Sequence, residues 1–175
     1  MVRGGFPEPF LAQEPVDADR WRREYVDGLI RRDIFDIEKV HDLRAIQLVL
    51  ELLRERVGAP VSYASIARDV EVAPNTVRKF IRILEALYIV FRVVPYTGNI
   101  ARSLIKHPKI YFFDNGMVRG DAGAVFENFT ALCLLKHVMG KTDYEGKEYG
   151  LRYIRTKEGR EVDFCIVRER KPEQL

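Results

Sequence analysis

The feature that most constrains the fold is a change in the spacing of apolar residues near position 88. Before it, apolar side chains recur every three or four residues, which is the period of a helix that buries one face. The longest such series is Ile37, Val40, Leu43, Ile46, Leu50, Leu53 and Val57. After it, "YIVFRVVPY" and "KIYFFD" are rich in the β-branched and aromatic residues that favour strands. Helices followed by strands predict an α+β fold.

Composition narrows the class of protein without indicating a function. The 175 residues suffice for one large or two small domains, and the net charge is only +3. Two cysteines without a CxxC spacing and three histidines are too few for a zinc framework and fit a reducing compartment. The first residues, "MVRGGFPEPF", lack the apolar stretch of a secretory signal, and the longest apolar run has six residues. We therefore expect a cytoplasmic protein, or a fragment of one, without a membrane span.

Capping and turn residues divide the chain into further elements. Residues 1–35 are interpreted as a connecting segment followed by a helix. Ser62 can cap a short helix that ends near position 69, and Pro74 can begin another that ends near position 87. A helix near 124–139 and a hairpin that turns at Glu158-Gly159 complete the pattern.

The two helices that start after Ser62 and at Pro74 fit a helix-turn-helix template. That motif needs a small residue in its first helix, here Ala67, and apolar residues where the pair meets the core. The apolar positions are Ile66, Val70, Val72, Val77 and Phe80. Glu71 stands where a turn glycine is often found. A preceding helix and a following two-stranded ribbon predict the winged variant over residues 36–113.

Basic residues gather on the outward side of this motif. Residues 74–109 hold seven Lys or Arg against the single acid Glu85. The second helix would present Asn75, Thr76, Arg78, Lys79 and Arg82, and the ribbon loop would add Arg102, Lys106 and Lys109. Polar residues at the start of that helix would enter a DNA major groove first, which favours DNA as a partner. The alternative is a protein-docking surface or a merely solvated face, because winged helices also serve protein contacts.

A second candidate site lies near the C-terminal end. In "EVDFCIV", strand alternation would place Glu161, Asp163 and Cys165 on one face and Val162, Phe164 and Ile166 on the other. Together with Glu127 from the preceding helix, Glu161 and Asp163 could hold a divalent cation such as Mg²⁺, which prefers carboxylate oxygens and can activate water for phosphodiester cleavage. The alternative is an ordinary solvated hairpin face.

Taken together, several stretches resemble one known family. "GGFPEPF", "RWRREYVDGLIRRDI", "SYASIARDVEVAPNTVRKFIRILEALYIVF", "ARSLIKHPKIYFFDNGMV", "FEN" and "GREVDFCIV" follow, in order, the region after the P-loop module in predicted bacterial and archaeal AAA-type ATPases. This region is usually called a domain of unknown function. The resemblance implies a winged helix and then, over residues 114–175, a partial α/β domain similar to restriction endonucleases. Glu127 would correspond to that domain's helix glutamate and Asp163 to its strand aspartate, which makes these two the catalytic candidates.

The chain departs from the family pattern in two respects. It has no GxxxxGK[ST], so ATP would be bound only by a separate AAA-type ATPase module. The family's following strand carries Glu-x-Lys, and here Glu169 and Lys171 of "ERK" fall in a charged stretch that we expect to be a turn. We therefore expect no ATPase activity and no hydrolysis by this chain alone, and no cofactor of its own beyond a possible Mg²⁺.

Three functional hypotheses follow from the sequence. The first is a nucleic-acid-binding accessory region of an AAA-type ATPase. The second is a protein-interaction or homo-oligomerisation region that positions the ATPase module. The third is a metal-dependent nuclease domain that lacks its last catalytic strand.

Overall fold

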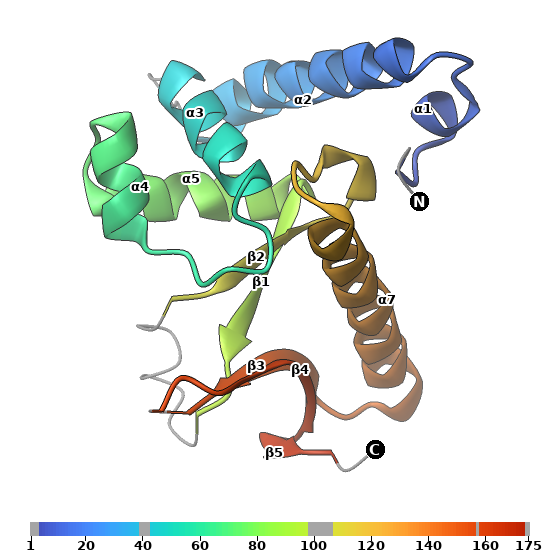
Figure 1. Ribbon diagram of the computed structural model, residues 1–175, viewed down its shortest axis with the longest axis vertical. Coiled ribbons are helices and arrows are strands. Elements are labelled where there is room, and N and C mark those ends of the chain that lie inside the picture. Colours follow the sequence, from blue (N-terminus) through green and yellow to red (C-terminus); the bar gives the residue numbers. More distant parts are fainter. Residues whose placement is uncertain (1–3, 39–42, 98–106, 157, 174–175) are drawn as a thin grey trace.

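The protein is an α+β fold in which helices cover a mixed sheet on both faces (Figure 1). The computed structural model describes residues 4–38, 43–97, 107–156 and 158–173. Within these ranges it contains six α-helices, one short 3-10 helix and five strands. The α+β class expected from the sequence is therefore confirmed. None of the helices in these ranges combines the length and the apolar composition that a membrane span requires.

The helices come mainly from the first two thirds of the chain. They are α1 (Pro7–Leu11), α2 (Pro15–Glu38), α3 (Leu43–Arg54), α4 (Tyr63–Val70), α5 (Pro74–Ala86), the 3-10 helix η1 (Asn115–Met117) and α7 (Ala122–Glu145).

The apolar series from Ile37 onward was expected to form one helix, and this was wrong. Ile37 belongs to α2, whereas α3 begins at Leu43 and carries Ile46 and the members up to Leu53. The spacing of three and four residues continues across the boundary, so the sequence pattern alone did not reveal it.

The five strands form one sheet in the order β2-β1-β3-β4-β5. They are β1 (Val90–Pro95), β2 (Lys109–Phe112), β3 (Tyr149–Arg155), β4 (Glu161–Arg168) and β5 (Lys171–Pro172). The first half of β1 pairs antiparallel with β2, and its last two residues, Val94 and Pro95, pair in parallel with β3. β3 and β4 form the hairpin expected from the sequence. β1 thus pairs with β2 at one end and with β3 at the other, so strands of the expected domains 36–113 and 114–175 belong to a single sheet.

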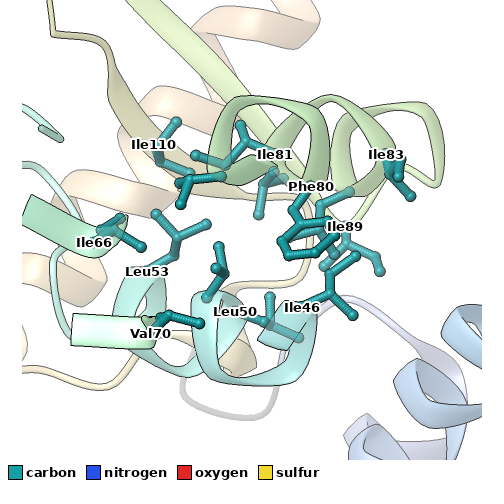
Figure 2. Packing of buried hydrophobic residues seen from close by; sticks show 14 of the residues in the cluster. Ile46, Leu50, Leu53, Ile66, Val70, Phe80, Ile81, Ile83, Ile89 and Ile110 are labelled. Carbon is teal, nitrogen blue, oxygen red and sulfur yellow. The ribbon is translucent and has the colours of Figure 1, made fainter. Parts of the chain in front are cut away.

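Each face of the sheet carries its own hydrophobic core. On one face, α3, α4 and α5 enclose a cluster with β1 and β2 that Figure 2 shows from close by. Its most deeply buried members include Ile46, Leu53, Ile66, Val77, Ile81, Leu84, Val90, Ile110 and Phe112. On the other face, α7 packs on the sheet through Ala131 and Val138, which meet Phe91, Tyr111 and Leu151. Alternation along β1 and β2 supplies both cores from the same two strands.

Local chemistry explains the turn between α4 and α5. The Ser62 hydroxyl accepts a hydrogen bond from the backbone N–H of Ser65, and Pro74 occupies the first turn of α5, both as expected. Glu71 adopts the left-handed conformation, with φ of 60°. A residue with a side chain is strained there, so the position where a turn glycine is common indeed has the geometry that favours glycine.

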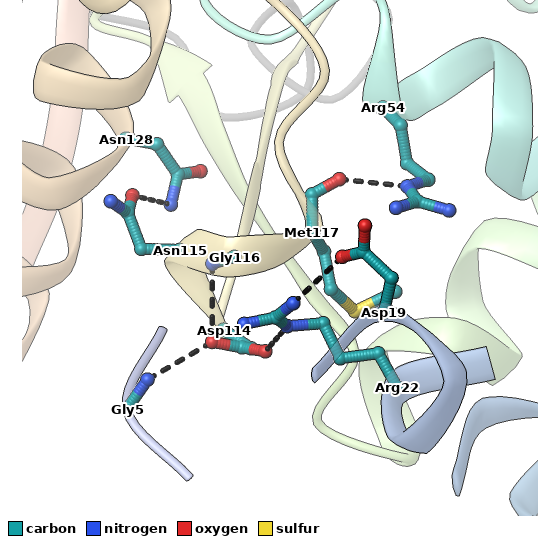
Figure 3. A network of polar contacts seen from close by, with 9 residues as sticks. All are labelled: Gly5, Asp19, Arg22, Arg54, Asp114, Asn115, Gly116, Met117 and Asn128. Carbon is teal, nitrogen blue, oxygen red and sulfur yellow. Dashed lines mark hydrogen bonds and ion pairs between the residues drawn. The ribbon is translucent and has the colours of Figure 1, made fainter. Parts of the chain in front are cut away.

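Buried polar contacts fix the segment that follows β2 (Figure 3). The Asp114 carboxylate accepts hydrogen bonds from Arg22 Nε at 2.9 Å, from the Gly5 N–H at 3.0 Å and from the Gly116 N–H at 3.2 Å. Asp114 and Arg22 are both almost fully buried. The connecting segment expected within residues 1–35 thus contains α1, and its Gly5 is hydrogen-bonded to a residue 109 positions away.

Asn128 attaches α7 to the outer edge of the sheet. Its Oδ1 accepts a hydrogen bond from the Phe112 N–H at 2.7 Å, and its Nδ2 donates to the Phe112 carbonyl at 3.0 Å. The same amide donates to Asn115 Oδ1 (Figure 3). β2 is an edge strand, and the buried amide occupies backbone groups that would otherwise lack a strand partner. The contact also fixes where the neighbouring Glu127 lies against β2.

Phe80 provides a test of the first core. It is 3% exposed and lies between α5 and α3 in Figure 2. We expect Phe80→Ala to lower the free energy of unfolding by about 3–5 kcal/mol, because it removes buried apolar surface and leaves a cavity. Urea denaturation followed by circular dichroism measures the change. Arg82→Ala, an exposed position on the same helix, is the matched control and should change stability by less than about 0.5 kcal/mol. Equal stability of the two variants would contradict the placement of α5.

Candidate functional site

The first candidate site is the basic face of α5, formed by Asn75, Thr76, Arg78, Lys79 and Arg82. The structure places all five on the outward side of the helix: four are exposed and Thr76 is half-buried. The opposite side of α5 is buried through Val77, Phe80, Ile81, Ile83 and Leu84. This division arises because apolar residues recur at helical spacing between the polar ones.

Two cations of this face, Arg78 and Arg82, are available to a partner. The Arg78 guanidinium lies 5.6 Å from the centroid of the Tyr63 ring, a cation–π contact that supports it without neutralising it. Neither Arg78 nor Arg82 forms an ion pair with a carboxylate in the described ranges. Arg92 differs, because its Nε lies 2.7 Å from Glu85 Oε2. Glu85, the single acid within residues 74–109, is therefore paired with Arg92 of β1 and does not neutralise Arg78 or Arg82.

The remaining expected members of the basic surface do not extend it in the described part of the chain. Arg102 and Lys106 lie outside the described residues. Lys109 was expected on an exposed loop, and this was wrong: it is the first residue of β2 and its side chain is 1% exposed. Period-two alternation puts Lys109 on the same face as Tyr111, which packs in the second core. That spacing was the signal in the sequence for its burial.

The second candidate site surrounds the Lys109 ammonium. Nζ lies 2.7 Å from Asp163 Oδ1, 2.7 Å from Glu161 Oε1 and 3.5 Å from Glu127 Oε1. We call these four residues the lysine–carboxylate cluster. β2 supplies the lysine, α7 supplies Glu127 and β4 supplies the other two acids. The structure thus brings the sequence candidates Glu127, Glu161 and Asp163 together, on one side of the sheet, around a residue that had been assigned elsewhere.

An irregularity in the β3–β4 pairing builds this arrangement. Arg152 pairs with Cys165 and Ile154 pairs with Val162, so three steps along β4 match two steps along β3. Such a bulge redirects side chains. The expected alternation was therefore wrong in part: the Phe164 ring lies 5.6 Å from that of Tyr111, on the same side as Asp163, whose carboxylate bonds to Lys109.

Tyrosines and a glycine that the sequence interpretation missed complete the surroundings. The Tyr111 hydroxyl donates a hydrogen bond to Glu127 Oε1 at 2.7 Å, and the ring centroid of Tyr153 lies 5.6 Å from Lys109 Nζ. Gly58 has φ of +80°, and a Cβ at that position would lie 2.5–2.8 Å from the Glu127 carboxylate. The backbone conformation therefore favours glycine at position 58, and a side chain there would displace the Glu127 carboxylate.

Electrostatics explains why a buried lysine is tolerated here. Burial alone would lower the pKa of Lys109, but hydrogen bonds to Asp163 and Glu161 and the charge of Glu127 outweigh it and leave the pKa raised. Burial, followed by the hydrogen bond to Glu127, raises the pKa of Tyr111. Both groups therefore remain protonated at neutral pH, and the lysine stays charged among three acids. The pKa of Lys109 is higher in the folded than in the unfolded protein, so its charge stabilises the folded state at all pH values below the ordinary lysine pKa. This stabilisation is lost only as the pH rises through the raised pKa of the folded state.

The cluster does not fit a divalent cation in this arrangement. The point where the three carboxylates converge is taken by the Lys109 ammonium, which makes close contacts to all of them. Across the ranges that the structure covers, no group of three or more His, Cys, Asp or Glu side chains is arranged to hold a metal ion. Carboxylates that satisfy an ammonium at 2.7 Å would have to exchange that partner before they could ligate Mg²⁺.

Comparisons with known proteins identify the family of this α+β protein. Residues 1–124 match the family model described as "Domain of unknown function (DUF8612)", and the chain belongs to that family. The matched residues include all of α1 to α5, β1 and β2, and therefore both the basic face of α5 and Lys109. They end before the three acids of the lysine–carboxylate cluster.

Two relatives illustrate how far the similarity extends. The chain is 28% identical over 117 residues to the uncharacterized protein Rv2008c of Mycobacterium tuberculosis, a match that covers 67% of this chain and 26% of that protein. It is 24% identical over 179 residues to the uncharacterized protein MJ1544 of Methanocaldococcus jannaschii, covering 96% of this chain and 38% of that protein. The chain thus spans well under half the length of these relatives. No solved structure matches.

Replacement of Lys109 tests the cluster. We expect Lys109→Met to lower the free energy of unfolding at pH 7 by about 2–3 kcal/mol, less than for fully buried pairs because the acids remain 23–56% exposed. Without the ammonium the three carboxylates repel one another, so the deficit should shrink as salt screens that repulsion. Urea denaturation at about 0.1 M and about 1 M NaCl measures this, with the exposed Lys136→Met as control. A deficit independent of salt would show that Lys109 acts by packing alone.

Proposed function

We propose that this chain is a nucleic-acid-binding region in which α5 is the contact helix. The observation that carries the proposal is the basic face of α5, where three cations stand exposed and two of them, Arg78 and Arg82, have no carboxylate partner among the described residues. Phosphate neutralisation by such residues is the main source of affinity for nucleic acid. Asn75 and Thr76 at the start of the same helix offer donors and acceptors for base edges or phosphates.

The arrangement around α5 supports a winged helix-turn-helix interpretation. α4 and α5 pack together across a short turn, α3 packs behind them, and β1 and β2 follow as an antiparallel pair. In such a motif the second helix enters the major groove and the first crosses the backbone. In this interpretation β1 and β2 are the two strands of the wing.

An accessory role beside an ATPase module is the second element of the proposal. The sequence has no P-loop, and its stretches resemble the region that follows the P-loop module in AAA-type ATPases. The relatives are long enough to contain such a module, since the match covers only 26% of one and 38% of another. In this proposal the partner module supplies ATP hydrolysis, and α5 supplies contact with nucleic acid.

The part after β2 would serve this role as an inactive relative of an endonuclease domain. Its helix, α7, and its hairpin of β3 and β4 carry Glu127 and Asp163 to one place, which is the feature that the resemblance implies. The lysine that meets them comes from β2 and neutralises them. We therefore propose a structural role for the lysine–carboxylate cluster, in which it joins β2, α7 and β4.

The salt dependence of DNA binding tests the main proposal. If Arg78, Lys79 and Arg82 each contact one phosphate of a duplex, log K should fall with log salt concentration with a slope of about −2.7 from these residues. Replacing all three with Ala should reduce the magnitude of the slope by that amount and weaken binding. Fluorescence anisotropy with a labelled duplex at about 50–250 mM NaCl, the range in which such slopes are resolved, measures both quantities.

A control of equal charge makes this experiment specific. Arg23, Arg31 and Lys136 are exposed cations on α2 and α7, and their triple replacement with Ala removes the same net charge. This control should leave the slope nearly unchanged. If the two triple variants bind DNA equally well, α5 is not the contact helix. If neither they nor the wild type binds DNA, the second hypothesis, a protein-interaction or oligomerisation region, becomes the better account.

A nicking assay tests the proposed inactivity. We expect supercoiled plasmid to remain intact with this chain in Mg²⁺ or Mn²⁺, because the carboxylates are engaged by Lys109. Agarose gel electrophoresis after incubation reports the outcome, with Asp163→Ala as the matched variant. Nicking by the wild type that disappears in Asp163→Ala would restore the third hypothesis, a metal-dependent nuclease.

A further inference from the structure

A small pocket lies where the end of β1 meets the start of β3 and the end of β4. It has a volume of about 120 Å³, and its walls include Tyr96, Glu148, Gly150, Arg152, Val167 and Arg170. Tyr149, Leu151 and Tyr153 of β3 face the α7 core, so alternation turns Gly150 and Arg152 toward the opposite face of the sheet. Its lining in the described ranges includes no residue of α5 and none of the lysine–carboxylate cluster. We call it the Arg152 pocket.

Arg152 is held in a fixed position but is not neutralised. A Cβ on Gly150 would lie 3.2 Å from Arg152 Nη1 and 3.3 Å from its Cζ, so the guanidinium lies over the glycine and in close contact with it. Its one hydrogen bond in the described ranges runs from Nη1 to the Leu151 carbonyl at 2.9 Å. No carboxylate of those ranges is within ion-pair distance. Burial lowers the pKa of this arginine, and the more distant charge of Glu148 opposes that effect.

The lining of the pocket includes a second cation, Arg170. Arg170 belongs to the tight turn that joins β4 to β5, in which Glu169 and Arg170 have φ of 47° and 71°. Residues with side chains rarely adopt this left-handed conformation. The turn is held by the hydrogen bond from the Glu169 N–H to the Glu148 carbonyl at 2.8 Å. Arg152 and Arg170 against Glu148 leave the pocket with a net charge of +1.

We propose that the Arg152 pocket binds one phosphate group, with the Arg152 guanidinium as its principal ligand. A planar guanidinium with free N–H groups matches two phosphate oxygens at once. A half-buried cation without an anionic partner is unfavourable, and a bound phosphate would compensate it. The net charge of +1 suits a phosphate anion, either free phosphate or the phosphodiester of a nucleic acid, which carries a single negative charge. The inference stands independently of the role of α5.

NMR spectroscopy of the arginine side chains tests this site directly. The Arg152 Nε–Hε signal is followed in separate titrations with sodium phosphate and with the dinucleotide dTpdT, each compared with NaCl at equal ionic strength. We expect a saturable shift that NaCl does not reproduce. Saturation by phosphate alone identifies free phosphate as the source, and saturation by dTpdT identifies a phosphodiester. A signal that does not saturate with either ligand overturns the proposal.

Two variants separate the placement of the guanidinium from its charge. Arg152→Gln removes the cation, and we expect at least tenfold weaker binding, measured from the shifts of neighbouring backbone amides. Gly150→Ala keeps the charge but displaces the guanidinium slightly, so it should weaken binding less than Arg152→Gln does. Arg160→Gln, at an exposed arginine on the β3–β4 turn, removes the same charge as Arg152→Gln and should leave affinity unchanged.

Equal affinity of Arg152→Gln and wild type would overturn the assignment even if phosphate binds elsewhere. The variants of α5 should not affect this titration.

Discussion

The buried ammonium of Lys109 is the interaction on which the arrangement of the two halves depends. A lysine that is 1% exposed is unfavourable unless carboxylates surround it, and these come from two elements further along the chain. Glu127 arrives on α7, and Glu161 and Asp163 arrive on β4, about fifty residues after the lysine. The helix and the hairpin must therefore both close over β2. In return, the ammonium offsets the repulsion among three neighbouring carboxylates.

Two further buried polar contacts determine how closely these parts can approach. Asn128 bonds to the backbone of Phe112 and so places the first turns of α7 beside β2, one residue from Glu127. Asp114, just after β2, accepts from Arg22 and from Gly5 and so brings α2 and the segment before α1 to the same end of the sheet. Each contact satisfies groups that would be costly to bury alone, so the three together define one arrangement of helices around the sheet.

Some charged side chains near the sheet are paired with opposite charges, and others are not. Several acids near the sheet are occupied: Glu85 by Arg92, and the acids of the cluster by Lys109. Within the described part of the chain, Arg78 and Arg82 of α5 have no such compensation, and neither does the guanidinium of Arg152. These uncompensated cations lie on different elements, two on a helix and one within the sheet. The two proposals together assign phosphate contacts to two separate places, α5 and the Arg152 pocket.

The sequence by itself determined the local structure. Apolar spacing of three and four residues predicted that the chain before position 88 is mainly helical, although it did not separate α2 from α3. Ser62 and Pro74 marked the starts of α4 and α5, and the exposure of Arg78 and Arg82 followed from the burial of Val77 and Phe80 at helical intervals. It also indicated that Glu127 and Asp163 belong together, through a family resemblance. Tertiary structure decided the rest, because long-range pairing carries no local signal: the partner change along β1, the anchoring of Gly5 by Asp114, and the bulge that turns both Asp163 and Phe164 toward α7. Lys109 shows the difference most clearly. Its basic character in the sequence suggested a nucleic-acid contact, whereas its place on an inward strand face, among acids 18 to 54 residues away, made it part of the interior.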